Sequence, residues 1–204
     1  MKQYNFNDLK DKVCVITGGA GIIGSALAKG LASAGAKTAI LEMDYDNAEK
    51  LSKEIKNEYQ TESSAYKSDV LDKENLKEIK KQINKDLGSV DVLINCAGGN
   101  SPKATTDKEI LTKEDLNDLK GSFFDMSMEG FDFVYSLNFK GTLLPIMVFG
   151  EDMMKKGEGN ILNISSMAAI STITKVPAYS AAKAAITNFT KWLSVHLAQT
   201  GIRV

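Results

Sequence analysis

The chain has 204 residues, of which 43% are hydrophobic and 25% charged, and its formal net charge is -1. This length and balance predict one domain with a single hydrophobic core, and they argue against nucleic acid or a membrane as partner. The apolar runs are shorter than a membrane span, the N-terminus is not a signal peptide, and one histidine with two cysteines indicates no metal site and no Ser-His-Asp hydrolase. We therefore expect a cytoplasmic protein.

Short apolar segments alternate with helical segments along the whole chain. The predicted strands are residues 13–16, 38–41, 64–67, 90–94 and 160–164. Helical signals separate the first four, at about residues 25–34, 46–59 and 73–85. Short apolar strands that are separated by helices predict a parallel sheet covered on both faces. The expected fold is a doubly wound α/β sheet, a Rossmann fold, in one domain.

A glycine-rich turn follows the first predicted strand. Residues 17–24 read TGGAGIIG, so that G-x-G-x-x-G falls on Gly19, Gly21 and Gly24. Without Cβ atoms the backbone can approach a pyrophosphate, whose charge suits a helix N-terminus. Glu42, at the end of the second predicted strand, can accept hydrogen bonds from ribose hydroxyls and would repel a 2′-phosphate. The turn therefore predicts a dinucleotide site that favours NAD(H) over NADP(H).

A tyrosine and a lysine share one face of the last predicted helix. Tyr179 and Lys183 are four residues apart, one helical turn, and Ser166 lies thirteen residues before the tyrosine. An ammonium group beside a phenol favours the ionised phenol, which can then exchange protons near neutral pH. A Y-x-x-x-K pattern alone is weak evidence, because both residues also occur on solvated helix faces. Whether the pattern indicates catalysis in this sequence therefore depends on the other motifs, such as the dinucleotide turn.

In this order the motifs resemble those of the short-chain dehydrogenase/reductase family, over essentially the whole chain. The Asn-Asn-Ala-Gly motif of that family appears as Asn95-Cys96-Ala97-Gly98, with one asparagine replaced by cysteine. The catalytic residues that the resemblance implies are Asn138, Ser166, Tyr179 and Lys183. The cofactor residues that it implies are Gly18, Gly19, Gly21, Ile22, Ile23, Gly24, Glu42, Asp69, Val70, Asn95, Ala97, Gly98, Tyr179 and Lys183.

The resemblance implies hydride exchange between a nicotinamide and an alcohol carbon. Tyr179 would exchange the proton of the alcohol, Lys183 would hold the nicotinamide ribose, and Ser166 would hydrogen-bond the substrate oxygen. Asn138 would hold a water that relays protons from Lys183 to solvent. Pro145, in the same predicted helix as Asn138, cannot donate to the carbonyl four residues before it. We therefore expect a kink near the site.

The sequence departs from the common family pattern in three places. Its middle glycine is Gly21, followed by Ile22, a spacing that resembles the extended, epimerase-like branch. Residues 100–125 lengthen the chain before Asn138, and we expect this insert near the active-site mouth, with a surface or oligomer-interface role as the alternative. The chain stops where a sixth strand would start. Residues 1–204 are thus expected to form a single NAD-binding domain without the C-terminal strands of the family.

Residues 97–106, the insert and residues 137–145 resemble the D-mannonate oxidoreductases (fructuronate reductases) of this family, which interconvert D-mannonate and D-fructuronate. A sugar acid needs a cation for its carboxylate and donors for its hydroxyls. The candidate substrate residues are Asn100, Lys103, Ser166 and Lys175. A gluconate- or polyol-type dehydrogenase, an epimerase or dehydratase, and a silent NAD-binding protein are the alternatives. For the full-length protein a homotetramer or homodimer is expected.

Overall fold

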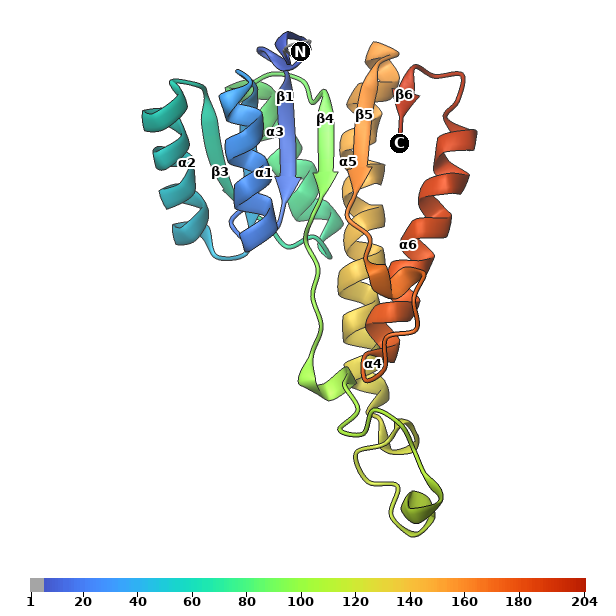
Figure 1. Ribbon diagram of the computed structural model, residues 1–204. Coiled ribbons are helices and arrows are strands. Elements are labelled where there is room, and N and C mark those ends of the chain that lie inside the picture. Colours follow the sequence, from blue (N-terminus) through green and yellow to red (C-terminus); the bar gives the residue numbers. More distant parts are fainter. Residues whose placement is uncertain (1–5) are drawn as a thin grey trace, which may run out of the picture.

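The computed structural model describes residues 6–204 (Figure 1). Six parallel strands form one sheet in the order β3-β2-β1-β4-β5-β6. The strands are β1 (Val13–Thr17), β2 (Lys37–Glu42), β3 (Ser63–Lys67), β4 (Val92–Asn95), β5 (Gly159–Asn163) and β6 (Ile202–Arg203). The strand order reverses between β1 and β4, the point where doubly wound sheets bind their ligands. The predicted fold class is confirmed.

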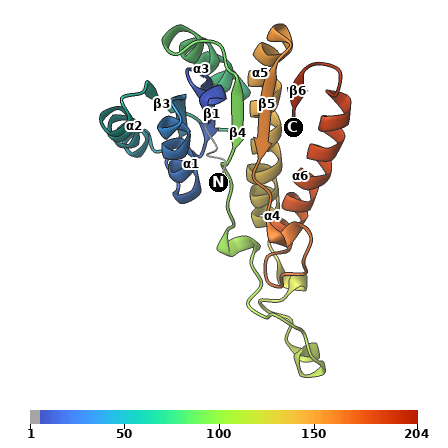
Figure 2. The same ribbon diagram turned by 45° about the horizontal axis from the view of Figure 1, so that its top comes forward.

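Helices cover both faces of the sheet (Figures 1 and 2). They are α1 (Ile22–Ser33), α2 (Tyr45–Tyr59), α3 (Lys73–Asp86), α4 (Met128–Tyr135), α5 (Gly141–Lys156) and α6 (Pro177–His196). One hydrophobic cluster joins the sheet to α1 and α2, and a second joins it to α3, α5 and α6. The sheet is therefore buried between two helical layers, as its short apolar strands predict.

The residues of β1 show how one apolar run serves both layers. All five of its residues are buried. Val13 and Val15 belong to the cluster with α3 and α5, whereas Cys14 and Ile16 belong to the cluster with α1 and α2. Alternate side chains point to opposite faces, so a strand covered on both faces needs apolar residues at every position. Cys14 is thus a buried hydrophobe, and burial raises the pKa of its thiol to about 12.

Capping residues mark the ends of several helices. Asp72 caps α3, and its carboxylate accepts the backbone N–H groups of Glu74 and Asn75 at 3.0 Å each. Asp44 caps α2 in the same way. Gly157, with φ of 68°, ends α5 in a left-handed conformation that favours glycine. Helix α1 begins at Ile22, three residues before the predicted start, because Gly21 of the turn is itself its N-cap residue.

Residues 128–156 form a helical stretch with an irregular turn inside it. Between α4 and α5 lies a π-helical turn, Ser136–Lys140, in which Gly141 N–H donates to the carbonyl of Ser136. The irregularity therefore lies in the turn before Pro145, which sits inside α5. Of residues 6–204 this helical stretch is the one long and apolar enough to cross a membrane, and 50% of its apolar window is buried within the fold.

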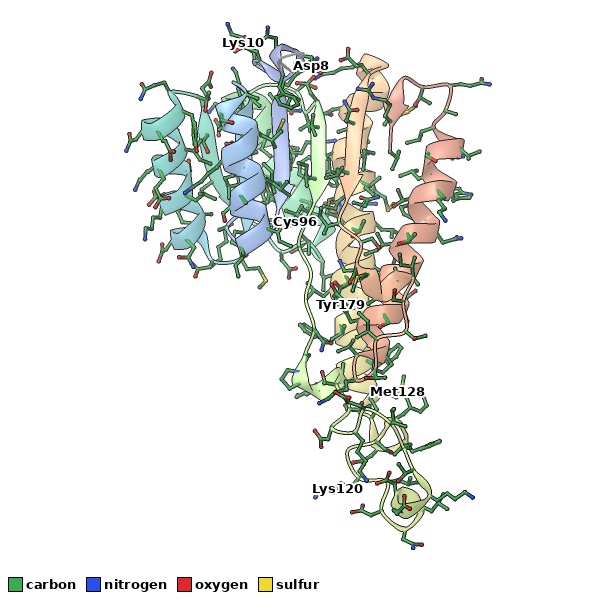
Figure 3. All side chains as sticks on the ribbon, in the orientation of Figure 1. Asp8, Lys10, Cys96, Lys120, Met128 and Tyr179 are labelled. Carbon is green, nitrogen blue, oxygen red and sulfur yellow. The ribbon has the colours of Figure 1, made fainter. Side chains whose placement is uncertain are left out.

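The insert forms an arm that projects away from the sheet (Figures 1 and 2). It contains three short 3₁₀ turns, at Pro102–Ala104, Lys113–Asn117 and Phe123–Asp125. Figure 3 shows Lys120 near its far end, well away from Tyr179. At its base, Thr106 N–H donates to the carbonyl of Lys175 at 2.9 Å. The arm is therefore fastened to the loop that precedes α6.

Candidate active site

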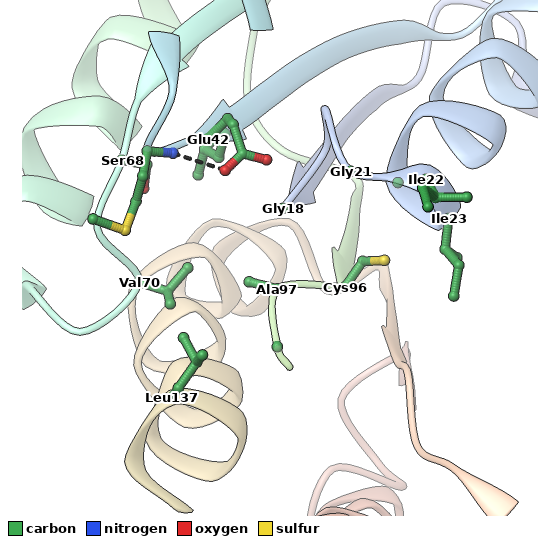
Figure 4. Close-up of a pocket in the computed structure, with 14 residues that line it drawn as sticks. Gly18, Gly21, Ile22, Ile23, Glu42, Ser68, Val70, Cys96, Ala97 and Leu137 are labelled. Atoms are coloured by element: carbon green, nitrogen blue, oxygen red, sulfur yellow. Dashed lines mark hydrogen bonds between the residues drawn. The ribbon is translucent and has the colours of Figure 1, made fainter. Parts of the chain in front are cut away.

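A cleft of about 450 Å³ opens at the carboxyl ends of β1, β2 and β4 (Figure 4). It is lined by Gly18, Gly21, Ile22, Ile23, Gly24, Leu41, Glu42, Met43, Ser68, Val70, Cys96, Ala97, Gly98 and Leu137. Most residues predicted to hold the cofactor are among these. Five are not among them. Gly19 bonds to the end of β2, Asp69 to the start of α3 and Asn95 to β5, while Tyr179 and Lys183 lie on α6. The cleft lies at the topological switch point of the sheet.

Gly18, Gly19 and Gly24 of the turn have no room for a side chain. Gly18 has φ of +61°, and a Cβ on it would lie 2.8 Å from the Cα of Ala97. A Cβ on Gly24 would overlap the carbonyl oxygen of Gly18. Helix α1 has no side-chain cap at Gly21, so the N–H groups of its first turn remain available to an anion. The turn thus brings backbone donors close to whatever occupies the cleft.

Glu42 faces this turn from the end of β2 (Figure 4). Its carboxylate accepts hydrogen bonds from Ala20 N–H at 3.3 Å and from Met43 N–H at 3.0 Å. No lysine or arginine is among the residues that line the cleft. The carboxylate is therefore held in place without a cation, which suits ribose hydroxyls and disfavours a phosphate.

Lys183 is buried on α6 and lies next to Gly98, which lines the cleft. Its Nζ donates to the carbonyl of Ile164 at 2.8 Å and lies 5.5 Å from the centre of the Tyr179 ring. Burial lowers the pKa of Lys183, and the nearby Cys96 opposes this shift. A Cβ on Gly98 would lie 3.5 Å from Nζ. Gly98 also lines the cleft, so it joins the cleft to the predicted catalytic residues.

Asn138 is fully buried in the π-helical turn. Its Nδ2 donates to the carbonyls of Gly99 at 2.7 Å and Val134 at 2.8 Å, and its Oδ1 accepts from Gly99 N–H at 3.3 Å. Both amide hydrogens are thus used within the protein. The side chain ties the loop after β4 to the helix, and a water beside it would have to donate to Oδ1 or to a backbone group.

The two serines after β5 have different surroundings. Ser166 Oγ accepts from Ala168 N–H at 3.1 Å, which leaves its own proton for another acceptor. Ser165 Oγ lies 2.6 Å from Thr187 Oγ1 and 3.2 Å from the carbonyl oxygen of Lys183. Ser166, which the thirteen-residue spacing predicts as the substrate-binding serine, thus has a free proton, whereas the hydroxyl of Ser165 is already engaged with α6.

Three of the predicted substrate residues, Asn100, Lys103 and Lys175, do not line the cleft. Asn100 donates to Thr105 Oγ1 at 2.8 Å, within its own loop. Lys103 is exposed and lies 3.8 Å from a carboxylate oxygen of Glu129. Lys175 lines a second groove of about 670 Å³, between the insert and α6. The structure thus does not bring these three side chains together at the cleft.

Leu41, Met43, Ser68, Cys96 and Leu137 line the cleft but were not among the predicted site residues. Cys96 follows the fourth predicted strand, residues 90–94. In the structure β4 ends at Asn95, and Cys96 lies half-buried in the wall of the cleft (Figures 3 and 4). Burial raises the pKa of its thiol, and the charge of Lys183 opposes this. Its position directly after an apolar strand, beside Ala97 and Gly98, was the available signal.

Comparisons with known proteins agree with this geometry. A family model described as short chain dehydrogenase matches residues 12–204. The chain is 49% identical over 197 residues to an uncharacterized oxidoreductase of Haemophilus influenzae, covering 97% of this chain and 68% of the relative. It is 48% identical over 197 residues to an uncharacterized oxidoreductase, UxuB, of Bacillus subtilis, covering 97% of this chain and 69% of that protein.

Two solved structures extend the comparison. One, from Haemophilus influenzae, is described as a candidate D-mannonate oxidoreductase with bound NAD; it has a TM-score of 0.91 and 48% identity, and the match covers 97% of this chain and 71% of that one. The other is an NAD+-bound xylitol dehydrogenase, with a TM-score of 0.84 and 28% identity, and the match covers 96% of this chain and 68% of that one.

Proposed function

The chain belongs to the short chain dehydrogenase family, and on this premise we propose that it oxidises or reduces a sugar acid, D-mannonate or D-fructuronate, with NAD(H). It is an NAD(P)-dependent oxidoreductase by family. The observation that carries the proposal is the position of Gly98, which lines the cleft and lies against both Asn138 and Lys183. A nucleotide in the cleft would therefore end beside the proposed proton-transfer residues.

The residues of the cleft fit a dinucleotide. Gly18 and Gly24 allow close approach of the backbone, and the uncapped first turn of α1 supplies donors for a pyrophosphate. The carboxylate of Glu42 accepts ribose hydroxyls, while Val70 and Leu137 supply apolar walls. NAD(H), when bound, supplies or accepts the hydride. The absence of a cation beside Glu42 among the lining residues favours NAD(H) over NADP(H).

Residues of the chain itself transfer the proton of the substrate hydroxyl. Tyr179 exchanges it with the substrate hydroxyl, and the ammonium of Lys183, 5.5 Å from the ring centre, stabilises negative charge on the phenol oxygen. Ser166 donates its free proton to the substrate oxygen. Asn138 holds the loop at Gly99 in place, and a water near it completes a path to solvent.

The substrate assignment is supported by the relatives at 48–49% identity, one of which is described as a candidate D-mannonate oxidoreductase. A carboxylate substrate needs a cation, and Lys175 is our candidate because it lies on the loop between Ser166 and α6; the substrate would then extend from the cleft toward the groove that Lys175 lines. Asn100 and Lys103 would contact the substrate only after leaving their present partners. The likeness to a xylitol dehydrogenase favours a polyol as the second candidate.

We propose that the enzyme works as a homodimer or homotetramer in the cytoplasm. Met147 and Met154 on α5, and Trp192 and Val195 on α6, are exposed apolar side chains that a partner subunit could cover. Cys14 and Cys96 are both free thiols, which is usual in a reducing compartment. Light scattering on the purified protein measures the subunit number.

The reaction is tested by following NADH absorbance with purified protein and a panel of D-mannonate, D-fructuronate, gluconate and xylitol. We expect turnover with D-mannonate or D-fructuronate, and a higher kcat/KM with NAD(H) than with NADP(H). Turnover confined to xylitol or gluconate would overturn the substrate assignment but keep the reaction class. Flat traces with the whole panel would overturn the proposed function.

Replacing Tyr179 by phenylalanine tests the proton-transfer step. We expect Tyr179→Phe to lower kcat by roughly 100- to 10,000-fold, the usual contribution of general acid–base catalysis. NAD affinity, measured by calorimetry, should be nearly unchanged, because the ring and its packing against the cluster of Ala104, Val134 and Ala178 remain. Tyr135→Phe, on α4 outside the cleft, is the control and should keep wild-type turnover. A Tyr179→Phe enzyme that turned over normally would contradict the mechanism.

A further inference from the structure

Two hydroxyl side chains that the proposed mechanism does not use, those of Ser165 and Thr187, lie next to Ser166 and Lys183. Ser165 precedes Ser166 after β5, and Thr187 lies one helical turn after Lys183 on α6. Their oxygens are 2.6 Å apart. Each also reaches the carbonyl oxygen of Lys183, at 3.2 Å from Ser165 and at 3.0 Å from Thr187.

The three contacts share only two hydroxyl protons. If both hydroxyls donated to Lys183 C=O, the two oxygens would face each other at 2.6 Å with lone pairs only, which is repulsive. Therefore either Thr187 donates to the carbonyl and Ser165 donates to Thr187, or Ser165 donates to the carbonyl and Thr187 donates to Ser165. In either arrangement the bond between Ser165 and Thr187 is made. This bond links the end of β5 to the helical turn of Lys183.

Lys183 has a second attachment to the same segment. Its Nζ donates to the carbonyl of Ile164 at 2.8 Å. Ile164 thus holds Lys183 by its ammonium, and Ser165 holds it by its main-chain carbonyl, either directly or through Thr187. Ser166 is the next residue. A shift of this segment along α6 would move the ammonium of Lys183 and the hydroxyl of Ser166 relative to Tyr179.

We propose that the Ser165–Thr187 hydroxyl pair is a positioning element that fixes Lys183 and Ser166 relative to Tyr179. Both are positioning residues, because they act through their neighbours. Their effect on turnover rests on the proposed function, whereas their effect on the surroundings of Lys183 does not.

The same two elements carry a natural control one turn further along α6. Asn163 Nδ2 donates to Thr190 Oγ1 at 2.9 Å, and Thr190 Oγ1 donates to the carbonyl of Ile186 at 2.8 Å. This tether also joins the β5 segment to α6 through a threonine, but it makes no bond to Lys183. Removing it should cost stability without moving the site.

The first experiment compares Thr187→Val, which keeps the shape and loses the hydroxyl, with Thr187→Ser, which keeps the hydroxyl. We expect Thr187→Val and Ser165→Ala to lower kcat by about 10- to 100-fold, a usual cost of misplacing catalytic groups, with NAD affinity little changed. Thr187→Ser should restore most of the turnover. Thr190→Val should lower the melting temperature and keep kcat.

The second experiment needs no substrate. The ammonium of Lys183 is titrated by NMR in protein with ¹³C-labelled lysine, with Lys183→Met to assign the signal. Burial lowers the pKa of Lys183, and Tyr179 and Cys96 are the titratable side chains that face it in the described chain. In Thr187→Val and Ser165→Ala we expect this pKa to rise, because the loosened segment admits water. In Thr187→Ser and Thr190→Val the pKa of Lys183 should be unchanged.

The outcomes separate this inference from the proposed function. If Thr187→Val and Ser165→Ala behave like Thr190→Val, with only a lower melting temperature, the pair is structural and the inference is overturned. If the Lys183 titration responds as expected but the wild-type protein shows no NAD-linked turnover, the positioning role holds and the proposed function fails. Should Thr187→Val not fold, Ser165→Ala gives the same readouts. We expect Ser165→Ala to fold, because Thr187 can still donate to the Lys183 carbonyl and leaves no buried group without a partner.

Discussion

Gly24 and Gly30 lie in the same helix, α1, but only one of them needs to be glycine. A Cβ on Gly24 would overlap the Gly18 carbonyl and lie 2.8 Å from the Cα of Gly19. A Cβ on Gly30 would meet nothing within 4 Å. Gly24 therefore lets the helix start against the turn, whereas Gly30 only weakens an exposed helix position.

Alanine at these two positions should have opposite effects. Gly24→Ala should lower the free energy of unfolding by about 1–3 kcal/mol through overpacking. It should also weaken NAD binding, because the turn must move. Gly30→Ala should raise the free energy of unfolding by roughly 0.5–1 kcal/mol through helix propensity. Urea unfolding and calorimetry with NAD measure both effects, and a Gly24→Ala protein that bound NAD normally would contradict the tight turn.

Helix α5 continues the turn that holds Asn138, so what anchors α5 also anchors the site. Lys80 of α3 reaches across to it: its Nζ donates to the carbonyl of Val148 at 3.0 Å and to Glu151 at 2.6 Å, and lies 3.7 Å from Asp152. Asp152 is buried, and Asn84 donates to it at 2.8 Å. The two helices are thus joined by a partly buried polar network.

Removing the cation of this network should be costly. Lys80→Met leaves Asp152 buried without an ammonium, and we expect a loss of about 3 kcal/mol in the free energy of unfolding. Lys77→Met on the same helix breaks only the exposed pair with Glu74 and should change it by less than about 0.5 kcal/mol. Urea unfolding of both variants at pH 7 measures the difference, and equal losses would show that the network adds nothing.

The same variant has a defined pH dependence. The hydrogen bond from Lys80 holds the pKa of Glu151 below its usual range. A lowered folded-state pKa stabilises the fold above the unfolded value, about 4.3, and this contribution disappears as pH falls through the lowered value. The difference between wild type and Lys80→Met should therefore shrink below about pH 4, by a small amount because Glu151 is largely exposed.

The arm formed by the insert stands outside the body that the sheet and its two helical layers form. Neither of the two large hydrophobic clusters contains a residue from it. Ala104, at its base, is buried against Val134 and Ala178, whereas further out the arm makes contacts within itself: Lys108 pairs with Asp115 at 2.6 Å and lowers the pKa of that carboxyl to about 2. Phe124 and Ile110 remain exposed. We propose that residues 1–204 form one domain and that the arm bears on substrate rather than on folding.

Shortening the arm tests this division of roles. Asp107 N–H donates to the carbonyl of Gly121 at 2.8 Å, so the ends of the arm are adjacent, and a short glycine-containing turn can replace residues 108–120. We expect an unchanged urea midpoint and unchanged NAD affinity, with a higher KM for the sugar acid. An unchanged KM together with a smaller particle in light scattering would indicate an oligomer-interface role instead.

The sequence by itself determined the fold class and the candidate residues, because both depend on local patterns. Burial on two faces makes the strands continuously apolar, a turn against a helix start needs glycine at Gly18 and Gly24, and the helical period puts Tyr179 and Lys183 on one face. Contacts between distant elements were decided by the tertiary structure alone. Packing placed Cys96 in the cleft wall and put Lys175 in a separate groove. Such contacts depend on how whole elements meet, which the spacing of residues within one element does not encode.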